Sequence, residues 1–188
     1  MFFVGRHQEI ATIEAAIAAG RNVIVRGKFG IGRTALVREV AGRNASRCKF
    51  VFTEFSAPKL ERAIAANRRR HKTILVLDDI RRMTHPKREL LRKLRASPSL
   101  LFIAILERFV SADDLMRFRV ALDPAVVVTL DYLDDESSIR FFSHHARRLG
   151  LPWTETDIEM LAHAMHGYPG EMTQLIQREQ RKRRAAAH

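Results

Sequence analysis

Short apolar runs alternate with amphipathic segments over the first 130 residues of the chain. Five of the runs predict β-strands: Asn22 to Arg26, Lys49 to Glu54, Thr73 to Leu77, Leu100 to Leu106 and Ala125 to Leu130. Several of these runs are apolar at consecutive positions, as is usual for strands that are buried on both faces. Segments with apolar residues at helical spacing separate the runs. The pattern therefore predicts an α/β fold with a parallel five-stranded sheet flanked by helices.

The strand pattern stops after the fifth run, and three helical segments follow. Acidic residues from Asp134 onward favour the start of the first helix, and Thr154 begins a capping-box pattern at the second. The third helix begins at about Pro169 and ends in a basic tail. We predict two domains, an α/β core over residues 1–131 and a small C-terminal helical lid over residues 132–188.

The composition excludes a disordered or low-complexity chain. The 188 residues are 46% hydrophobic and 29% charged, which is enough to bury a sizeable core. Cys48 is the single cysteine and cannot form an intramolecular disulfide, so a reducing compartment is predicted. The longest apolar run is far shorter than the roughly 20 residues that span a bilayer, and early charged residues interrupt any signal peptide. We expect a cytoplasmic protein without a membrane partner.

The segment GKFGIGRT, residues 27–34, fits the phosphate-binding pattern GxxxxGK[ST] at every position but one, where Arg33 replaces lysine. A predicted strand ends just before it and a predicted helix begins at its far end, which is the context that this motif requires. Glycines let backbone N–H groups turn around a phosphate, and the helix dipole favours the anion. The predicted phosphate-binding residues are Gly27, Lys28, Phe29, Gly30, Ile31, Gly32, Arg33, Thr34 and Ala35. The alternative is a Gly-rich turn without a ligand.

A second motif, ILVLDD, ends the third predicted strand at Asp78 and Asp79. A carboxylate at the end of a buried strand beside a phosphate-binding loop can hold Mg²⁺, so Asp78 and the Thr34 hydroxyl are the predicted metal ligands. The alternative is that the aspartates only cap the turn after the strand. A guanidinium is bulkier than an ammonium and planar, so Arg33 does not replace lysine conservatively. We therefore expect nucleotide binding with slow or absent hydrolysis.

Four segments together resemble the AAA+ and STAND P-loop ATPases: FVGR at residues 3–6, GKFGIGRTAL, ILVLDDI and GYPG at residues 167–170. The resemblance covers nearly the whole chain and keeps the order of the motifs. It implies that ATP or ADP binds with Mg²⁺, and that Val4, Gly5 and Pro169 lie near the adenine.

The resemblance also implies two catalytic residues. Asp79 occupies the position of a glutamate that activates the attacking water in many relatives, although its side chain is shorter. Arg108 follows the fourth strand, where STAND proteins carry Thr-Thr-Arg, and it is the candidate γ-phosphate sensor although both threonines are missing. Gly170 stands where many AAA+ proteins have a sensor arginine, which favours the STAND branch. Arg117 and Arg119 are candidate arginine fingers, and chance placement in an arginine-rich chain is the alternative.

Positive charge dominates the chain, because 33 Lys and Arg outnumber 21 Asp and Glu and leave a net charge of +12. Arg88, Arg92 and Arg95 form a stripe at helical spacing after the ILVLDD motif and could contact DNA phosphates. No aromatic residue is interleaved with them, which argues against a stacking platform for single strands. An ordinary solvated helix face is the alternative.

These features favour an ATP-binding AAA+ or STAND-like protein that acts as a nucleotide-dependent switch or adaptor on DNA or on a DNA-processing partner. We expect slow or impaired hydrolysis, and assembly with further copies or with a partner protein that supplies missing domains. A non-catalytic DNA-binding or assembly module on a degenerate ATPase scaffold is the alternative. A small-molecule kinase is a minor third interpretation, because P-loops also serve phosphoryl transfer.

Overall fold

A computed structural model describes residues 2–65, 72–80, 83–95, 97, 99–107 and 110–186. The chain forms two compact units. The α/β unit comprises His7–Lys28 and Arg33–Leu130, and the helical unit comprises Met1–Arg6, Phe29–Gly32 and Asp131–His188. Within the described residues, no helix is both long and apolar enough to cross a membrane.

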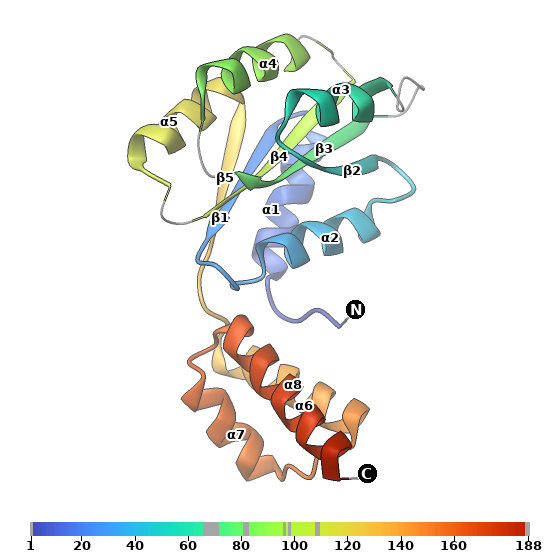
Figure 1. Ribbon diagram of the computed structural model, residues 1–188, viewed down its shortest axis with the longest axis vertical. Coiled ribbons are helices and arrows are strands. Elements are labelled where there is room, and N and C mark those ends of the chain that lie inside the picture. Colours follow the sequence, from blue (N-terminus) through green and yellow to red (C-terminus); the bar gives the residue numbers. More distant parts are fainter. Residues whose placement is uncertain are drawn as a thin grey trace. The chain divides into compact units, whose positions relative to one another are not determined.

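The α/β unit is built on a parallel five-stranded sheet, as predicted (Figure 1). Its strands are β1 (Asn22–Gly27), β2 (Lys49–Glu54), β3 (Thr73–Ile80), β4 (Leu100–Glu107) and β5 (Ala125–Leu130). The strand order is β2-β3-β4-β1-β5, which places β1 between β4 and β5. The predicted strands agree with the observed ones, except that β1 and β4 run one residue further and β3 three residues further.

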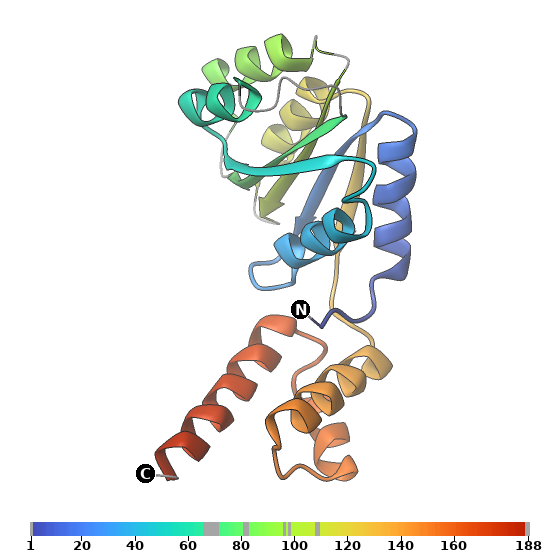
Figure 2. The same cartoon turned by 90° about the vertical axis from the view of Figure 1, so that its right-hand side faces the viewer.

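Five helices cover the sheet: α1 (His7–Ala18), α2 (Arg33–Arg43), α3 (Ala57–Ala65), α4 (His85–Arg95) and α5 (Ala112–Ala121). Helices α3, α4 and α5 lie on one face and α1 and α2 on the other (Figures 1 and 2). Leu60, Leu91 and Phe118 join the first face to a core that includes Phe102 of β4. Both faces of the sheet are thus covered, which is why its strands are apolar at consecutive positions.

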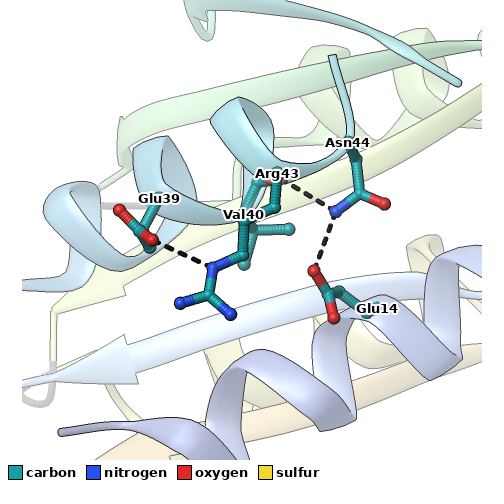
Figure 3. Close-up of polar contacts among 5 residues, drawn as sticks. All are labelled: Glu14, Glu39, Val40, Arg43 and Asn44. Carbon is teal, nitrogen blue, oxygen red and sulfur yellow. Dashed lines mark hydrogen bonds and ion pairs between the residues drawn. The ribbon is translucent and has the colours of Figure 1, made fainter. Parts of the chain in front are cut away.

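The end of α2 is tied to α1 by a polar link (Figure 3). The Asn44 side-chain amide donates one hydrogen bond to Glu14 of α1 at 3.0 Å and another to the Val40 carbonyl at 2.9 Å. The preceding residue, Arg43, pairs with Glu39 on the exposed side of α2 at 2.9 Å. The Val40 carbonyl also accepts from the Asn44 backbone N–H at 3.1 Å, so the Asn44 amide adds a second hydrogen bond at the end of α2 and links it to α1.

Asn22 is a buried polar residue at the start of the interior strand β1, with 4% of its surface exposed. Its side-chain amide donates to the Leu122 carbonyl at 2.7 Å, and its carbonyl oxygen accepts from the Phe102 backbone N–H at 2.9 Å. Its own backbone N–H donates to the Pro124 carbonyl at 2.9 Å. One side chain therefore joins β1 to β4 and to the segment that leads into β5.

Three helices form the helical unit: α6 (Asp135–Leu149), α7 (Glu155–Ala164) and α8 (Pro169–Ala186). They enclose a core of their own around Phe142, with apolar residues from all three helices. The cap signals of the sequence are confirmed: the Asp134 carboxylate accepts from the Ser137 N–H at 2.6 Å, and Thr154 forms the predicted capping box with Asp157.

We predict that Asn22→Ala destabilises the α/β unit by about 2 kcal/mol or more. The substitution leaves the Phe102 N–H and the Leu122 carbonyl buried without these partners, and each such group costs about 1–3 kcal/mol. Urea unfolding followed by circular dichroism measures the change. Asn44→Ala, at a half-buried site with one fewer backbone partner, is the comparison and should cost less. Equal losses in the two variants would contradict the role of Asn22.

A second prediction concerns the acid stability of α6. The backbone hydrogen bond from Ser137 holds the pKa of Asp134 below its ordinary value. The carboxylate therefore stabilises the fold above the unfolded-state pKa of about 3.9, and this contribution is lost as the pH falls through the lower folded-state pKa. At pH 7, Asp134→Ala should lower the free energy of unfolding by about 1 kcal/mol, and the difference should shrink below about pH 3.9. Asp134→Asn, which keeps an acceptor that does not titrate, should stay close to the wild type at pH 7.

Candidate functional site

The predicted site residues of the α/β unit gather at the carboxyl edge of the sheet. Because parallel strands end at the same edge, Gly27 of β1, Asp78 of β3 and Glu107 of β4 all lie there, and Gly27 is in register with Glu107. From β1 the chain continues to β2 at one edge of the sheet, and from β4 it continues to β5 at the opposite edge. The neighbouring strands β1 and β4 therefore flank a topological switch point. Ligands of open α/β sheets bind outside the strand ends at such points.

The loop between β1 and α2 has the backbone that the glycine pattern predicts. Gly30 and Gly32 have φ angles of 76° and 96°, which side chains other than hydrogen rarely allow. The Ile31 side chain between them is 2% exposed, whereas Phe29 is 73% exposed. Helix α2 begins at Arg33, directly after the second of these glycines. The loop therefore ends in a helix N-terminus, where backbone N–H groups are available to an anion.

The two predicted metal ligands lie together in the structure. The Thr34 hydroxyl, on the first turn of α2, donates a hydrogen bond to the Asp78 carboxylate near the end of β3, with 3.1 Å between Oγ1 and Oδ2. A hydroxyl and a carboxylate are the hard oxygen ligands that Mg²⁺ prefers, and this ion usually takes its remaining ligands from water and substrate phosphates. The donor set at Thr34 and Asp78 thus fits a phosphate-bound Mg²⁺.

Arg33 is directed to a carboxylate that sequence reasoning overlooked. Its guanidinium Nη2 lies 3.9 Å from Oε1 of Glu107, the last residue of β4. The Arg33 side chain is 11% exposed and that of Glu107 is 39% exposed, so the pair is only partly open to solvent. The signal for Glu107 is its place at the end of a predicted strand beside Arg108. Its partner depends on the register of β4 with β1, which the sequence does not display.

Three predicted residues near the adenine belong to the helical unit. A Cβ added to Gly5, which has a φ of 67°, would lie 2.9 Å from the Ser137 hydroxyl of α6. Val4 is the neighbour of Gly5 and is half-buried, and Pro169 is the first residue of α8. The Tyr168 hydroxyl, just before Pro169, donates to the Phe29 carbonyl of the glycine-rich loop.

The two predicted catalytic residues are only partly covered by the structure. Asp79 lies within β3, but its side chain is outside the described set, and Arg108 is outside the described residues altogether. Their roles remain predictions.

On α4, the predicted DNA-binding stripe is partly engaged within the protein. Arg92 pairs with Glu89 at 2.9 Å, and Arg95 donates to the Asp123 carbonyl at 2.6 Å. Arg88 is exposed.

The backbone of the glycine-rich loop can be tested without any ligand. Gly32→Ala should lower the free energy of unfolding by about 1–3 kcal/mol, because the φ of 96° strains any side chain even though nothing lies within 4 Å of the added Cβ. The matched control is Gly42→Ala inside α2, where nothing lies within 4 Å either and alanine should stabilise the helix by about 1 kcal/mol. Urea unfolding measures the change in the free energy of unfolding of both variants. If alanine changes stability in the same direction at Gly32 and at Gly42, the loop backbone is not strained.

No protein-family model and no curated protein matches this sequence. Solved structures do match the fold. RuvB from Thermotoga maritima, the Holliday junction branch migration motor, superimposes with a TM-score of 0.65 and 17% identity over 94% of this chain and 62% of that chain. Hsp104 from S. cerevisiae in complex with casein has a TM-score of 0.74 and 14% identity, over 92% of this chain and 36% of that chain.

The replication initiator DnaA bound to AMPPCP and single-stranded DNA also matches, with a TM-score of 0.65 and 14% identity over 94% of this chain and 62% of that chain. This chain spans less than two thirds of the length of each of these three proteins. All three are AAA+ P-loop ATPases, and identities this low relate folds rather than activities. The chain has the fold of the AAA+ P-loop ATPases.

Proposed function

We propose that this chain binds an adenine nucleotide with Mg²⁺ at the carboxyl edge of the sheet and acts as a nucleotide-dependent switch or adaptor with slow hydrolysis. The observation that carries the proposal is the contact of Thr34 with Asp78 at 3.1 Å. Thr34 lies on the first turn of α2, which follows the glycine-rich loop in the sequence. A ligandless Gly-rich turn has no need of a hydroxyl and a carboxylate in contact beside it.

Different residues of the site would bind the phosphates, the metal ion and the attacking water. The backbone N–H groups of the glycine-rich loop and of the first turn of α2 would bind the phosphates, with the helix dipole favouring the negative charge. Thr34 and Asp78 would hold Mg²⁺, which would neutralise charge on the phosphate oxygens. Asp79 and Arg108 are proposed to activate water and to sense the γ-phosphate.

The pair formed by Arg33 and Glu107 supports slow turnover. A phosphate that Arg33 binds must share the guanidinium with the Glu107 carboxylate or displace that carboxylate, and the carboxylate repels the phosphate. A guanidinium also has a fixed planar fork, which does not reproduce the compact charge of an ammonium between phosphates. Binding of the nucleotide and stabilisation of its reaction would therefore be separated, as a switch requires.

DNA, or a partner that processes DNA, is the proposed target, and STAND-like proteins the proposed kin. The net charge of +12 and the exposed Arg88 favour a polyanion. Two structural neighbours act on DNA: DnaA is bound to single-stranded DNA, and RuvB is a branch migration motor. Residues 1–131 would form the nucleotide-binding core and 132–188 the lid. We further propose assembly with copies of the chain or with a protein that supplies missing domains.

A second candidate function is a non-catalytic DNA-binding or assembly module on a degenerate ATPase scaffold. The engagement of Arg33 by Glu107 is the observation that favours it, because a stable pair would leave the arginine unable to serve a phosphate. Nucleotide binding separates the two candidates.

The test is calorimetric titration of Mg-ATP and Mg-ADP, with phosphate release followed on the same samples. The wild type should bind both nucleotides and turn over well below about 1 per second. Arg33→Lys should keep binding and raise turnover at least roughly tenfold, because a lysine ammonium can lie between the phosphates. Arg43→Lys is the matched control, since Arg43 lies on the exposed side of the same helix and pairs there with Glu39.

Two outcomes would count against the proposal. Rapid hydrolysis by the wild type would contradict a slow switch. Failure of both the wild type and Arg33→Lys to bind either nucleotide would contradict the nucleotide site and favour the non-catalytic module.

A further inference from the structure

Helix α6 carries a positively charged surface that lies outside the glycine-rich loop. A surface pocket of about 690 Å³ is lined by Phe2, Arg140, Ser143, His144, Arg147 and Arg148. We call it the α6 pocket. All of its lining residues belong to the helical unit. Five of them follow one another on α6 at spacings of one, three or four residues, so they share one side of that helix.

An aromatic pair forms part of the pocket wall. The Phe2 ring stacks on the His144 ring, with 3.7 Å between the centroids and 7° between the planes. It also meets His145 edge-on at 6.4 Å. Phe2 and His144 are both half-buried, so the pair is held in place but still presents surface to the pocket. Phe2 is distant in sequence from every basic residue of α6, so the sequence does not show that this ring lies beside these arginines.

Two of the arginines carry charge that the protein does not offset. Arg147 and Arg148 are exposed, and among the described residues neither has an ion-pair partner. Arg140, in contrast, lies 3.7 Å from Glu136. The pKa of His145 is lowered first by burial and then by the nearby Arg148 and His144, so positive charge prevails around this side chain.

The end of α6 does not explain these arginines. Basic residues often stabilise a helix C-terminus by binding its last carbonyls. Here Arg183 of α8 already does so, because it donates to the Leu149 carbonyl at 3.0 Å and to the Gly150 carbonyl as well. Arg147 and Arg148 remain available on the surface for an external anion.

Arg140, at one end of the α6 pocket, donates to the Ser137 hydroxyl at 3.4 Å, but the end that carries His144, Arg147 and Arg148 lies apart from the proposed nucleotide site. Ser137 is the α6 residue beside Gly5, near which the adenine is predicted. His144 follows Ser137 by seven residues and Arg147 by ten, which is about 10 Å and 15 Å along the helix axis at 1.5 Å per residue. One nucleotide at Gly5 would therefore not fill the pocket.

We propose that the α6 pocket binds single-stranded nucleic acid, with a base stacked on Phe2 and phosphates beside Arg147 and Arg148. An aromatic platform next to uncompensated arginines is the combination by which proteins bind single strands without sequence preference. A duplex keeps the faces of its bases stacked inside and cannot use Phe2 in this way. The inference deepens the DNA-directed part of the proposed function and does not require a bound ATP.

The first experiment measures binding of a fluorescently labelled 20-nucleotide strand of mixed sequence, and of its duplex, by anisotropy over a range of salt concentrations. The full chain should bind the strand more tightly than the duplex. Replacing both arginines, Arg147→Gln with Arg148→Gln, should weaken strand binding roughly tenfold. The slope of log K against log salt should fall by about 1.4 in magnitude, at about 0.7 for each phosphate that an arginine no longer neutralises.

The matched control carries Arg21→Gln with Arg47→Gln, two exposed arginines of the α/β unit that remove the same charge elsewhere. It should retain most of the affinity. An equal loss in the control, or equal affinity for strand and duplex, would overturn the proposal in favour of general attraction to polyanions.

Stacking has its own signature. Phe2→Ala should weaken strand binding at least about fivefold without changing the salt slope, since base stacking contributes about 1–3 kcal/mol and releases no counterions. Phe2→Trp, which keeps an aromatic ring at this position, should bind the strand about as tightly as the wild type does. Two results would overturn the role of Phe2: weak strand binding by Phe2→Trp, or a changed slope of log K against log salt in Phe2→Ala.

Two further measurements identify the ligand and separate this inference from the proposed function. Inorganic tripolyphosphate should displace the strand poorly, and displacement at equal phosphate concentration would overturn the proposal in favour of a small polyphosphate. Calorimetric titration of Mg-ATP into the double arginine variant should match the wild type. Loss of strand binding with ATP binding intact places the effect on α6, whereas loss of ATP binding in the same variant would contradict a separate pocket.

Discussion

The interior strand β1 is the element on which the candidate site of the α/β unit depends. It pairs in parallel with β4 and β5, and Val23, Ile24 and Val25 are fully buried. Asn22 fixes its first end, where one side-chain amide satisfies backbone groups of two neighbouring segments. At its other end a buried strand must turn into a helix over a few residues, which requires positive φ angles and hence glycine. The backbone of the loop that is proposed to bind phosphate follows from that constraint.

Two side-chain links then connect the first turn of α2 to the strands that follow. Thr34 reaches Asp78 of β3, and Arg33 reaches Glu107 of β4. Both partners are carboxylates, so the edge that would receive a nucleotide already carries negative charge. A Mg²⁺ at Asp78 would turn one of these carboxylates into a favourable group, whereas Glu107 would remain opposed to phosphate. In the proposed function, the balance between Arg33 and Glu107 would therefore separate nucleotide binding from turnover.

The sequence predicts those features of the structure that depend on interactions between residues close together in the chain. The strands, the glycine-rich loop and the caps at Asp134 and Thr154 depend on residues close together in the chain, and the sequence displays them. The pattern ends β3 three residues early because two aspartates are typical of a turn, although Ile80 beyond them is buried. Sequence reasoning misses Glu107 because its role depends on strand register. It misses the α6 pocket because the packing of the first residues on α6 has no sequence signature.

Both proposed ligands bear on the helical unit. Residues 29–32 of the glycine-rich loop, Gly5 and Pro169 belong to it, and so does the α6 pocket. A nucleotide that contacts residues 29–32, Gly5 and Pro169 would therefore act on the same compact unit that would bind the single-stranded nucleic acid. Coupling is a difference in free energy between the states of that body and is reciprocal, so a nucleotide that strengthens strand binding is itself bound more tightly when the strand is present. A slow hydrolysis step would then set how long the coupled state lasts, and under the proposed function Arg33 would serve to time that step.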